Sequence, residues 1–147
     1  MARVVVAADY PVAAGTLWQS AVSYAALERM MSGPIVRVAC PPGEEQAGHD
    51  LTLVFRLFGR VPVGSWRLKI TRRDDIRRRL ASEESGLFVK SWHHEIAIDA
   101  LGANSARLTD TIEIDAGVLT PLIARFAQAD YARRHRLRQK FVNIRAL

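Results

Sequence analysis

The chain has 147 residues, of which 49% are hydrophobic and 24% are charged, so it is long enough for one domain with a buried core. No apolar run approaches the roughly 20 residues that a membrane-spanning helix needs. The single cysteine, Cys40, excludes an internal disulfide and a multi-cysteine zinc cluster. The N-terminal residues lack the long apolar segment of a secretory signal. We therefore expect a single domain over residues 1–147, located in the cytoplasm.

The formal net charge is +6, and its distribution along the chain is uneven. The first 50 residues contain three arginines and five acidic residues, so the positive excess lies in the remainder. A basic surface can attract nucleic acid or anionic membrane, but charge alone is a weak indicator, and a solvated basic face is the simpler interpretation. The residues concerned are Arg67, Lys69, Arg72, Arg77, Arg79 and the arginines of the C-terminal segment. We expect no nucleic-acid partner and no contact with the membrane interior.

The first part of the chain predicts one strand followed by two short helices. Residues 3–11 (RVVVAADYP) have the composition of a strand, which ends at a proline because proline cannot donate a ladder hydrogen bond. Residues 12–31 are helical in composition, and a glycine and a serine-rich stretch divide them into two helices. Ser23 is a suitable N-cap for the second helix, since its hydroxyl can accept from an unpaired backbone N–H group.

After the second helix the hydrophobic pattern changes to the alternation of β-strands. We predict strands over residues 35–40, 51–58, 63–73 and 76–83, the last of them exposed, with a polar loop at 41–50 and a turn at 74–75. In the third of these strands, Trp66, Leu68 and Ile70 share one face. The alternation therefore predicts a sheet with one apolar face.

Two long strands and one long helix complete the chain. The strands cover residues 87–99 and 105–117, joined by the hairpin sequence LGAN. Thr120 is a suitable N-cap for the final helix and Pro121 fits its first helical position. Apolar side chains then recur at helical spacing at Ile123, Phe126, Leu137 and Phe141.

This order of elements predicts an α+β fold. Antiparallel hairpins in sequence, followed by one amphipathic helix, favour a curved antiparallel sheet of about seven strands wrapped around the C-terminal helix. A sheet that grips a single helix cannot close its core everywhere, so we expect a cavity between the two.

Two adjacent histidines occupy the strand SWHHEIAID, residues 91–99. Because side chains of a strand alternate between its faces, the two rings point in opposite directions. His94 lies on the more apolar face, which we expect to line the cavity. His93 then points to solvent beside Glu95, and we assign it no role.

The next strand places Asp110 on the same apolar face as His94. If the hairpin is symmetric about residue 102, His94 lies opposite Asp110 and Trp92 lies opposite Ile112. A loop that differs by two residues makes these pairs diagonal but still within reach. An inward-facing His and Asp are costly unless they satisfy each other. The pair either fixes the strand register or contacts a ligand, and an acid/base role is a further step that requires a substrate.

Asp130 is a second polar residue on an apolar stripe, here that of the final helix. Arg134 follows four residues later, in the favoured spacing for an ion pair on a helix, and this is the simpler interpretation. Alternatively, Asp130 lies at the polar end of the cavity and contacts the head group of a ligand.

Four segments resemble a known superfamily. They are the opening YPVAAGTLWQSAVSYAALERM, the strand WHHEIAI, the answering strand LTDTIEID and the terminal helix with RRHRLRQKF. Together with the element order, they resemble the START-like, or polyketide-cyclase-like, superfamily, also called SRPBCC. The resemblance covers nearly the whole chain and implies a helix-grip fold that holds apolar ligands between sheet and helix. The superfamily includes binding proteins, lipid carriers, cyclases and aromatases, so membership does not define activity.

The resemblance and the predicted faces give one set of candidate ligand-binding residues. They are Phe55, Trp66, Leu68, Trp92, His94, Asp110, Ile112, Phe126 and Asp130. The aromatic members are also candidates for the core, because the wall of such a cavity is itself core.

The sequence thus favours a protein that binds a small hydrophobic or aromatic ligand, lipid-like or polyketide-like. The alternative is a cyclase or aromatase in which His94 moves protons and Asp110 orients it. We expect no cofactor and no metal, because there is no glycine-rich phosphate loop, no HExxH motif and no paired His-Cys set, and His49 stands alone in a loop. A homodimer is left open.

Overall fold

The computed structural model of the chain describes residues 1–146, with side chains up to Val142, so Leu147 of the predicted domain lies outside the described part. The elements are β1 (Ala2–Tyr10), α1 (Ala14–Val22), α2 (Tyr24–Met31), β2 (Val36–Val38), β3 (Asp50–Leu57), β4 (Val61–Asp74), β5 (Arg79–Gly86), β6 (Val89–Gly102), β7 (Ser105–Asp115), the short 3₁₀ helix η1 (Gly117–Leu119) and α3 (Thr120–Ala146).

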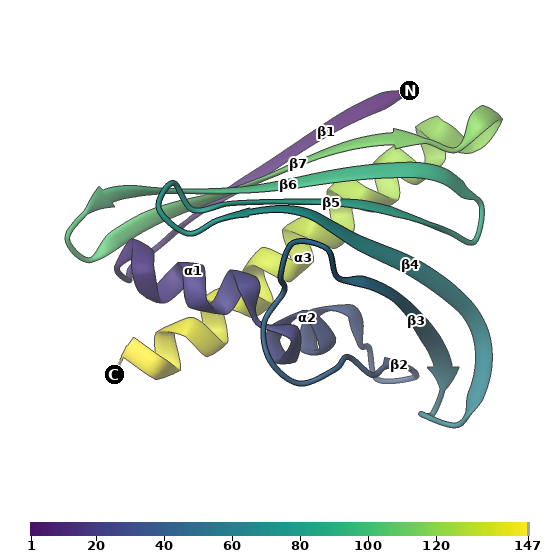
Figure 1. The fold of residues 1–147 in the computed structure, drawn as a ribbon, viewed down its shortest axis with the longest axis horizontal. Helices are drawn as coiled ribbons and strands as arrows, with labels where there is room; N and C mark the ends of the chain where they lie inside the picture. Colours follow the sequence, from purple (N-terminus) through teal and green to yellow (C-terminus); the bar gives the residue numbers. More distant parts are fainter. Residues whose placement is uncertain (147) are drawn as a thin grey trace.

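The strands form one seven-stranded antiparallel sheet in the order β1-β7-β6-β5-β4-β3-β2. The sheet curves over α3, which crosses beneath it, and α1 and α2 lie on the same side as α3 (Figure 1). The apolar side chains of β4, β6 and β7 alternate with exposed ones, and the buried set faces this helical layer. The predicted α+β helix-grip architecture is confirmed. None of the described helices combines the length and the apolar composition that a membrane span requires.

The fifth strand differs from its prediction. The sequence predicted an exposed strand at 76–83, whereas β5 begins at Arg79 and lies between β4 and β6. The preceding turn is longer than predicted because the Asp74 carboxylate accepts from the backbone N–H groups of Ile76 and Arg77. As a central strand, β5 buries Leu80 on the helical side, where the side chain lines the inner cavity.

The β6–β7 hairpin adopts the second of the two registers considered. His94 lies opposite Ile112, and Trp92 lies opposite Ile114, so the predicted direct pairs His94–Asp110 and Trp92–Ile112 are wrong. The reason is a register irregularity between Ala100 and Gly102, which moves the turn away from residue 102. His94 and Asp110 are therefore diagonal neighbours. The start of β6 also differs, because Leu87 and Phe88 form the β5–β6 turn.

The predicted helix caps are confirmed in one case and corrected in the other. The Ser23 hydroxyl accepts from the Ala26 backbone N–H at 3.3 Å and caps α2. Thr120 does not cap α3 in this way, since it is already the first residue of that helix. Its hydroxyl instead accepts from the Ala116 N–H and donates to the Gly117 carbonyl, so it closes η1.

We predict that Gly86→Ala destabilises the fold by about 1–3 kcal/mol. Gly86 has a φ of +144°, and a Cβ there would stand 2.5 Å from the Ser65 carbonyl oxygen. Urea unfolding measures the loss. The matched control is Gly15→Ala in α1, where a Cβ meets nothing within 4 Å and alanine favours the helix. Equal stability of the two variants would contradict the assigned backbone of β5.

Candidate functional site

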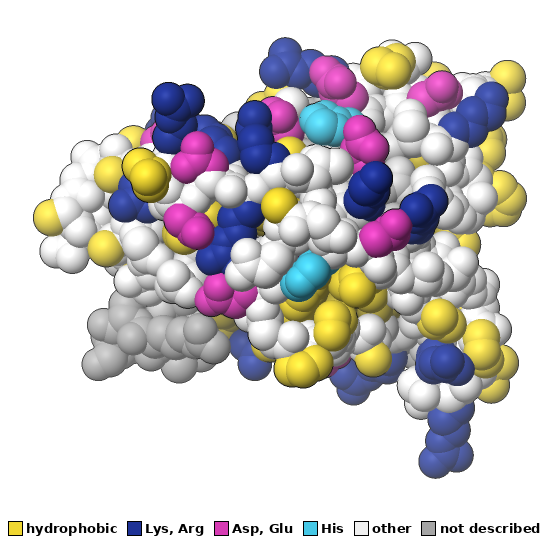
Figure 2. Space-filling view, in the orientation of Figure 1, with side chains coloured by type: hydrophobic (Ala, Val, Ile, Leu, Met, Phe, Trp, Pro, Cys, Tyr) yellow, Lys and Arg dark blue, Asp and Glu magenta, His cyan; other side chains and the backbone are white. Residues whose placement is uncertain are grey.

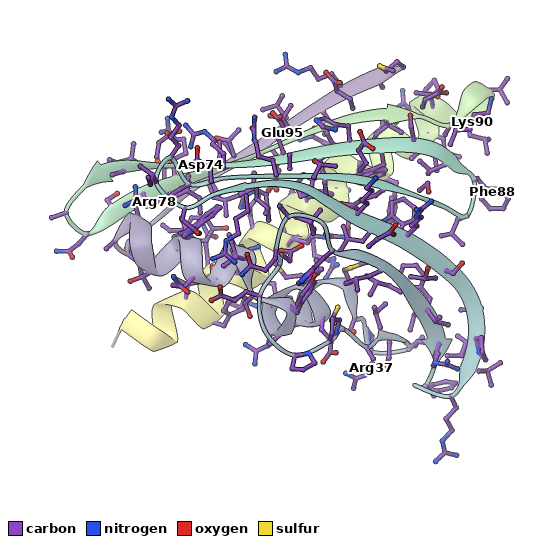
Figure 3. The ribbon with its side chains drawn as sticks, in the orientation of Figure 1. Arg37, Asp74, Arg78, Phe88, Lys90 and Glu95 are labelled. Carbon is purple, nitrogen blue, oxygen red and sulfur yellow. The ribbon has the colours of Figure 1, made fainter. Side chains whose placement is uncertain are left out.

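Two adjacent cavities lie between the concave face of the sheet and α3. The inner cavity has a volume of about 40 Å³, and the outer groove has a volume of about 400 Å³. Both are lined by Met31, Trp66, Glu84, Tyr131 and Arg134, which form their common wall. Figure 3 shows side chains from the sheet and the helices converging on the space between them.

The inner cavity is organised around the Asp110 carboxylate of β7. One oxygen of Asp110 lies 2.7 Å from His94 Nε2 on β6, a hydrogen bond. The other lies 2.9 Å from His135 Nε2 on α3, a close contact whose angle departs from that of a hydrogen bond. The Nδ1 atom of the His135 ring is 2.6 Å from the Tyr10 hydroxyl on β1. A continuous polar chain thus joins three strands to the helix.

Glu84 of β5 supplies a second carboxylate on the other side of His94. It accepts hydrogen bonds from Trp66 Nε1 at 2.6 Å and from the Ser82 hydroxyl at 2.8 Å. Its nearer oxygen is 3.7 Å from His94 Nδ1, an ion-pair contact rather than a hydrogen bond. The His94 ring therefore lies between two carboxylates, and Trp66 positions one of them.

Three further charged side chains line or adjoin the inner cavity. Arg138 is buried and donates to the Ser20 hydroxyl at 2.9 Å. The Arg134 guanidinium lies 4.5 Å from the centre of the Tyr131 ring, a cation–π contact. Glu45 is buried at the cavity wall, and no hydrogen bond is formed by its carboxyl group among the described residues. The inner cavity wall thus contains both arginine and carboxyl groups.

Burial and charge shift the pKa values of these groups in opposite directions. The pKa of Glu45 is raised to about 8, mainly by burial and further by the Glu84 carboxylate, against the opposing positive charges of His94, Arg138 and Arg73. Burial opposes protonation of His94, but hydrogen bonding and charge from Asp110 and Glu84 outweigh it and raise the pKa of His94 to about 9. Burial would raise the pKa of Asp110 and of Glu84, but their hydrogen bonds and the positive charge of His94 have the larger effect. The pKa of both carboxyls is therefore held below its usual range. At neutral pH the centre is therefore an imidazolium between two carboxylates, with Glu45 protonated.

The outer groove is apolar except along one side. Its wall is built from the β3–β4 hairpin, the β5–β6 turn and the first half of α3, and includes Phe55, Val63, Leu87, Phe88, Val89, Trp92, Ile123 and Phe126. The Trp66 and Trp92 rings meet edge to face, with centroids 5.4 Å apart, at the inner end. The polar side is formed by Asp130, which accepts from Arg134 Nε at 2.8 Å and from Arg133.

The structure brings most of the predicted site residues into these two cavities. Phe55, Trp66, Trp92, Phe126 and Asp130 line the outer groove, and Trp66, Leu68, His94 and Asp110 line the inner cavity. Two placements differ from the prediction. Ile112 is fully buried and lines neither cavity. Phe126 is 62% exposed at the rim of the groove rather than packed in the core.

Five site residues were missed by sequence reasoning: Glu45, Glu84, Tyr131, His135 and Arg138. His135 and Arg138 lie in an arginine-rich stretch that predicts a solvent-exposed helix face, because charged side chains are seldom buried. One signal was available. His135 follows Tyr131 by four residues and precedes Arg138 by three, so all three share one helix face.

The remaining sequence-based assignments concern individual side chains and ion pairs. His93 lies beside Glu95 at 3.6 Å, outside the cavity, as predicted. The Asp130–Arg134 ion pair is also confirmed. Several arginines considered for nucleic acid or membrane binding are engaged in ion pairs on the convex face: Arg67 with Asp50, Arg72 with Glu95 and Arg79 with Asp99. His49 Nδ1 lies 2.7 Å from the Tyr24 hydroxyl. Within residues 1–146, no group of three or more His, Cys, Asp or Glu side chains is arranged to hold a metal ion.

Comparison with solved structures defines the class of fold. A START superfamily protein from Mycobacterium smegmatis is 13% identical, with a TM-score of 0.70, over 96% of this chain and 97% of that one. Norcoclaurine synthase from Thalictrum flavum is 15% identical, with a TM-score of 0.69, over 99% and 96%. The Zhui aromatase/cyclase from a Streptomyces species is 20% identical, with a TM-score of 0.60, over 96% and 90%. The chain therefore has a START-like helix-grip fold, as its resemblance implied.

A family model then assigns the chain more narrowly. Residues 9–141 match the model described as a domain of unknown function, DUF8410, and the chain belongs to that family. No curated protein matches the sequence. The similarity to the solved structures extends to the fold alone.

We predict that the free energy of unfolding falls as the pH rises from 6.5 to 9. The raised pKa values of Glu45 and His94 mean that the folded chain binds more protons than the unfolded chain in this range. Each group can contribute at most ~1.4 kcal/mol per pH unit. The stabilisation from protonated His94 is complete below pH 6.5 and is lost as the pH passes its folded value of about 9.

Urea unfolding across this pH range, on three variants, tests that account. Glu45→Gln removes the contribution of one group, so its stability falls less steeply than that of the wild type. His94→Gln destabilises most at pH 6.5, and the difference narrows toward pH 9. His93→Gln, on the outer face beside Glu95, is the control and leaves the pH profile unchanged. A wild-type stability that is flat across this range would contradict the assigned charge states.

Proposed function

We propose that this protein binds a small, mainly apolar molecule in the groove between the sheet and α3. The observation that carries the proposal is the groove itself, about 400 Å³ in volume, lined by aromatic and aliphatic side chains and adjoining the buried polar cavity. Ligand sites in proteins usually have volumes of ~300–1,000 Å³ and combine an apolar wall with a few placed polar groups. Lipid-like and aromatic or polyketide-like molecules are the classes that match this wall.

The two cavities differ in size and polarity, so the proposed ligand has an apolar body in the outer groove and a polar end group at the inner cavity. The inner cavity of about 40 Å³ holds a few water molecules or one small polar group, since each water needs ~10–15 Å³ of such space. Glu45 as a neutral acid offers a donor there, and the Arg138 guanidinium offers others. A hydroxyl or carbonyl group at the end of an apolar body therefore complements this arrangement, and Asp130 with its two arginines lies along the body.

We expect Phe126→Ala to weaken binding of the neutral fluorescent probe phenylnaphthylamine. Phe126 lines the groove, and removing its ring loses roughly 1–3 kcal/mol of apolar contact, or about 5- to 150-fold in affinity. Fluorescence titration measures the dissociation constants.

The matched control is Leu122→Ala, one turn earlier on α3. Leu122 is also an exposed apolar residue but does not line the groove, so its loss leaves probe affinity unchanged. Both side chains are largely exposed, so neither change is expected to unfold the chain. If the two variants bind the probe as tightly as the wild type, the groove is not the binding site.

A second candidate function is acid/base catalysis of the cyclase or aromatase type. The observation that favours it is the His94–Asp110 hydrogen bond of 2.7 Å in the cavity wall. Two of the similar structures are a synthase and an aromatase/cyclase, so this fold supports catalysis in other chains. With its pKa raised to about 9, His94 would act at neutral pH as a proton donor rather than as a base.

If this chain is such an enzyme, His94→Gln abolishes turnover while probe binding in the groove persists. A glutamine keeps a donor toward Asp110 but cannot exchange a proton. The assay follows ring closure of a synthetic poly-β-ketone by the absorbance of its aromatic product. Turnover that survives in His94→Gln, in a protein that remains folded by circular dichroism, would exclude this mechanism.

A further inference from the structure

Exposed apolar side chains gather at the end of the molecule where the groove opens. The β3–β4 hairpin presents Phe58 and Val61, the β5–β6 turn presents Leu87 and Phe88, and the start of α3 with η1 presents Val118, Leu119 and Leu122. Phe58 is 73% exposed and Phe88 is 75% exposed. These segments end on the same side of the molecule, and Figure 2 shows hydrophobic side chains along that edge.

Contacts between the segments show that they form one rim. The Leu87 side chain packs against Gly64 of β4. The Lys90 ammonium group lies beside Gly117 of η1. On the other side, the Phe58 N–H donates to the Ile35 carbonyl at 2.7 Å, which ties the β3–β4 hairpin to the segment before β2. We call residues 34–38, 55–63, 86–90 and 117–129 the mouth.

The charge of the mouth has a single sign. Its four segments contain five basic residues and no aspartate or glutamate. The basic residues are Arg37, Arg56, Arg60, Lys90 and Arg125, all of them exposed. None of the five forms an ion pair within the described side chains. This contrasts with the convex face of the sheet, where Arg67, Arg72 and Arg79 are paired with carboxylates.

We propose that the mouth docks on the surface of a membrane that contains anionic lipids. Exposed aromatic and aliphatic side chains surrounded by cations match the boundary between lipid head groups and acyl chains. Each basic side chain near an anionic membrane surface strengthens attachment by about fivefold. Because the groove opens at this end, docking would place its opening against the lipid. The proposal concerns the surface and holds whether or not the groove carries a ligand.

The charge of the mouth favours a membrane over a second copy of the chain. A symmetric dimer through this face would bring two sets of five unpaired cations together without a carboxylate from the mouth to neutralise them. An anionic bilayer supplies the opposite charge and an apolar phase at once. Single-stranded nucleic acid supplies the charge but not the apolar phase that Val61, Val118 and Leu122 would contact.

The test is flotation of the purified full chain with vesicles, without added small ligand. We expect binding to an equal mixture of phosphatidylcholine and phosphatidylglycerol, little binding to phosphatidylcholine alone, and weakening as the NaCl concentration rises. Two variants of the mouth should reduce binding. Arg60→Glu with Arg125→Glu lowers it by at least roughly tenfold. Phe58→Asn removes an apolar contact, and asparagine tolerates the φ of +50° at that position.

The matched controls lie in the β4–β5 turn, at the opposite end of the sheet from Phe88 (Figure 3). Ile76 is 92% exposed and Arg77 is exposed, so Ile76→Asn and Arg77→Glu change the same kinds of side chain away from the mouth. They should bind vesicles as the wild type does. If variants of the mouth and of the β4–β5 turn lose vesicle binding equally, or if the wild type binds neutral and anionic vesicles equally, the proposal is overturned.

Two further measurements separate this proposal from its competitors. Sedimentation should show a monomer without lipid, and a dimer that Phe58→Asn dissociates would assign the mouth to a second copy instead. Tighter binding to a single-stranded oligonucleotide than to anionic vesicles would also overturn it. Phe58 does not line the groove, so Phe58→Asn should leave phenylnaphthylamine binding unchanged. Loss of vesicle binding with intact probe binding therefore bears on the mouth alone.

Discussion

A carboxylate taken out of water must be paired, and Asp110 meets that requirement by joining the sheet to the helix. His94 of β6 and His135 of α3 contact its two oxygens, and Tyr10 of β1 adjoins the second imidazole. Removing one partner of a buried pair typically costs ~3–5 kcal/mol, since it leaves an uncompensated charge. This requirement fixes the rotation of α3 about its axis and, with it, the residues that α3 presents to the cavity.

The same fixed helix divides the space beneath the sheet into two chemically different parts. Toward the C-terminal half of α3, the polar chain and Arg138 leave only a small inner cavity. Toward the N-terminal half, α3 presents Ile123 and Phe126 to the β3–β4 and β5–β6 hairpins, and an apolar groove remains. Trp66 belongs to both parts, because its ring lines the groove and its N–H holds Glu84. The groove and its polar end thus follow from one helix orientation.

The sequence was informative where the two-residue alternation of a strand alone determines which face a side chain occupies. Strand alternation placed His94 inward, and the shared face of two neighbouring strands identified Asp110 as its partner, although the register depended on a bulge that alternation does not reveal. Glu84 was missed because the predicted strand ended at residue 83, whereas β5 runs from Arg79 to Gly86. The shift arises from the preceding turn, which the Asp74 carboxylate lengthens. His135 and Arg138 were missed because a basic stretch on a helix is usually solvated. Their burial depends on tertiary contacts, of His135 with Asp110 and of Arg138 with Ser20, that the sequence does not reveal.

Native mass spectrometry of the purified chain, followed by extraction and identification of any bound compound, tests the central claim most directly. If the groove binds a small apolar molecule, the spectrum shows a one-to-one complex, and the extract contains an apolar compound with a hydroxyl or carbonyl end. A chain that is empty, and whose melting temperature is unmoved by a panel of lipids and aromatic polyketides, would contradict the account. The groove would then be a gap in the packing of sheet against helix rather than a binding site.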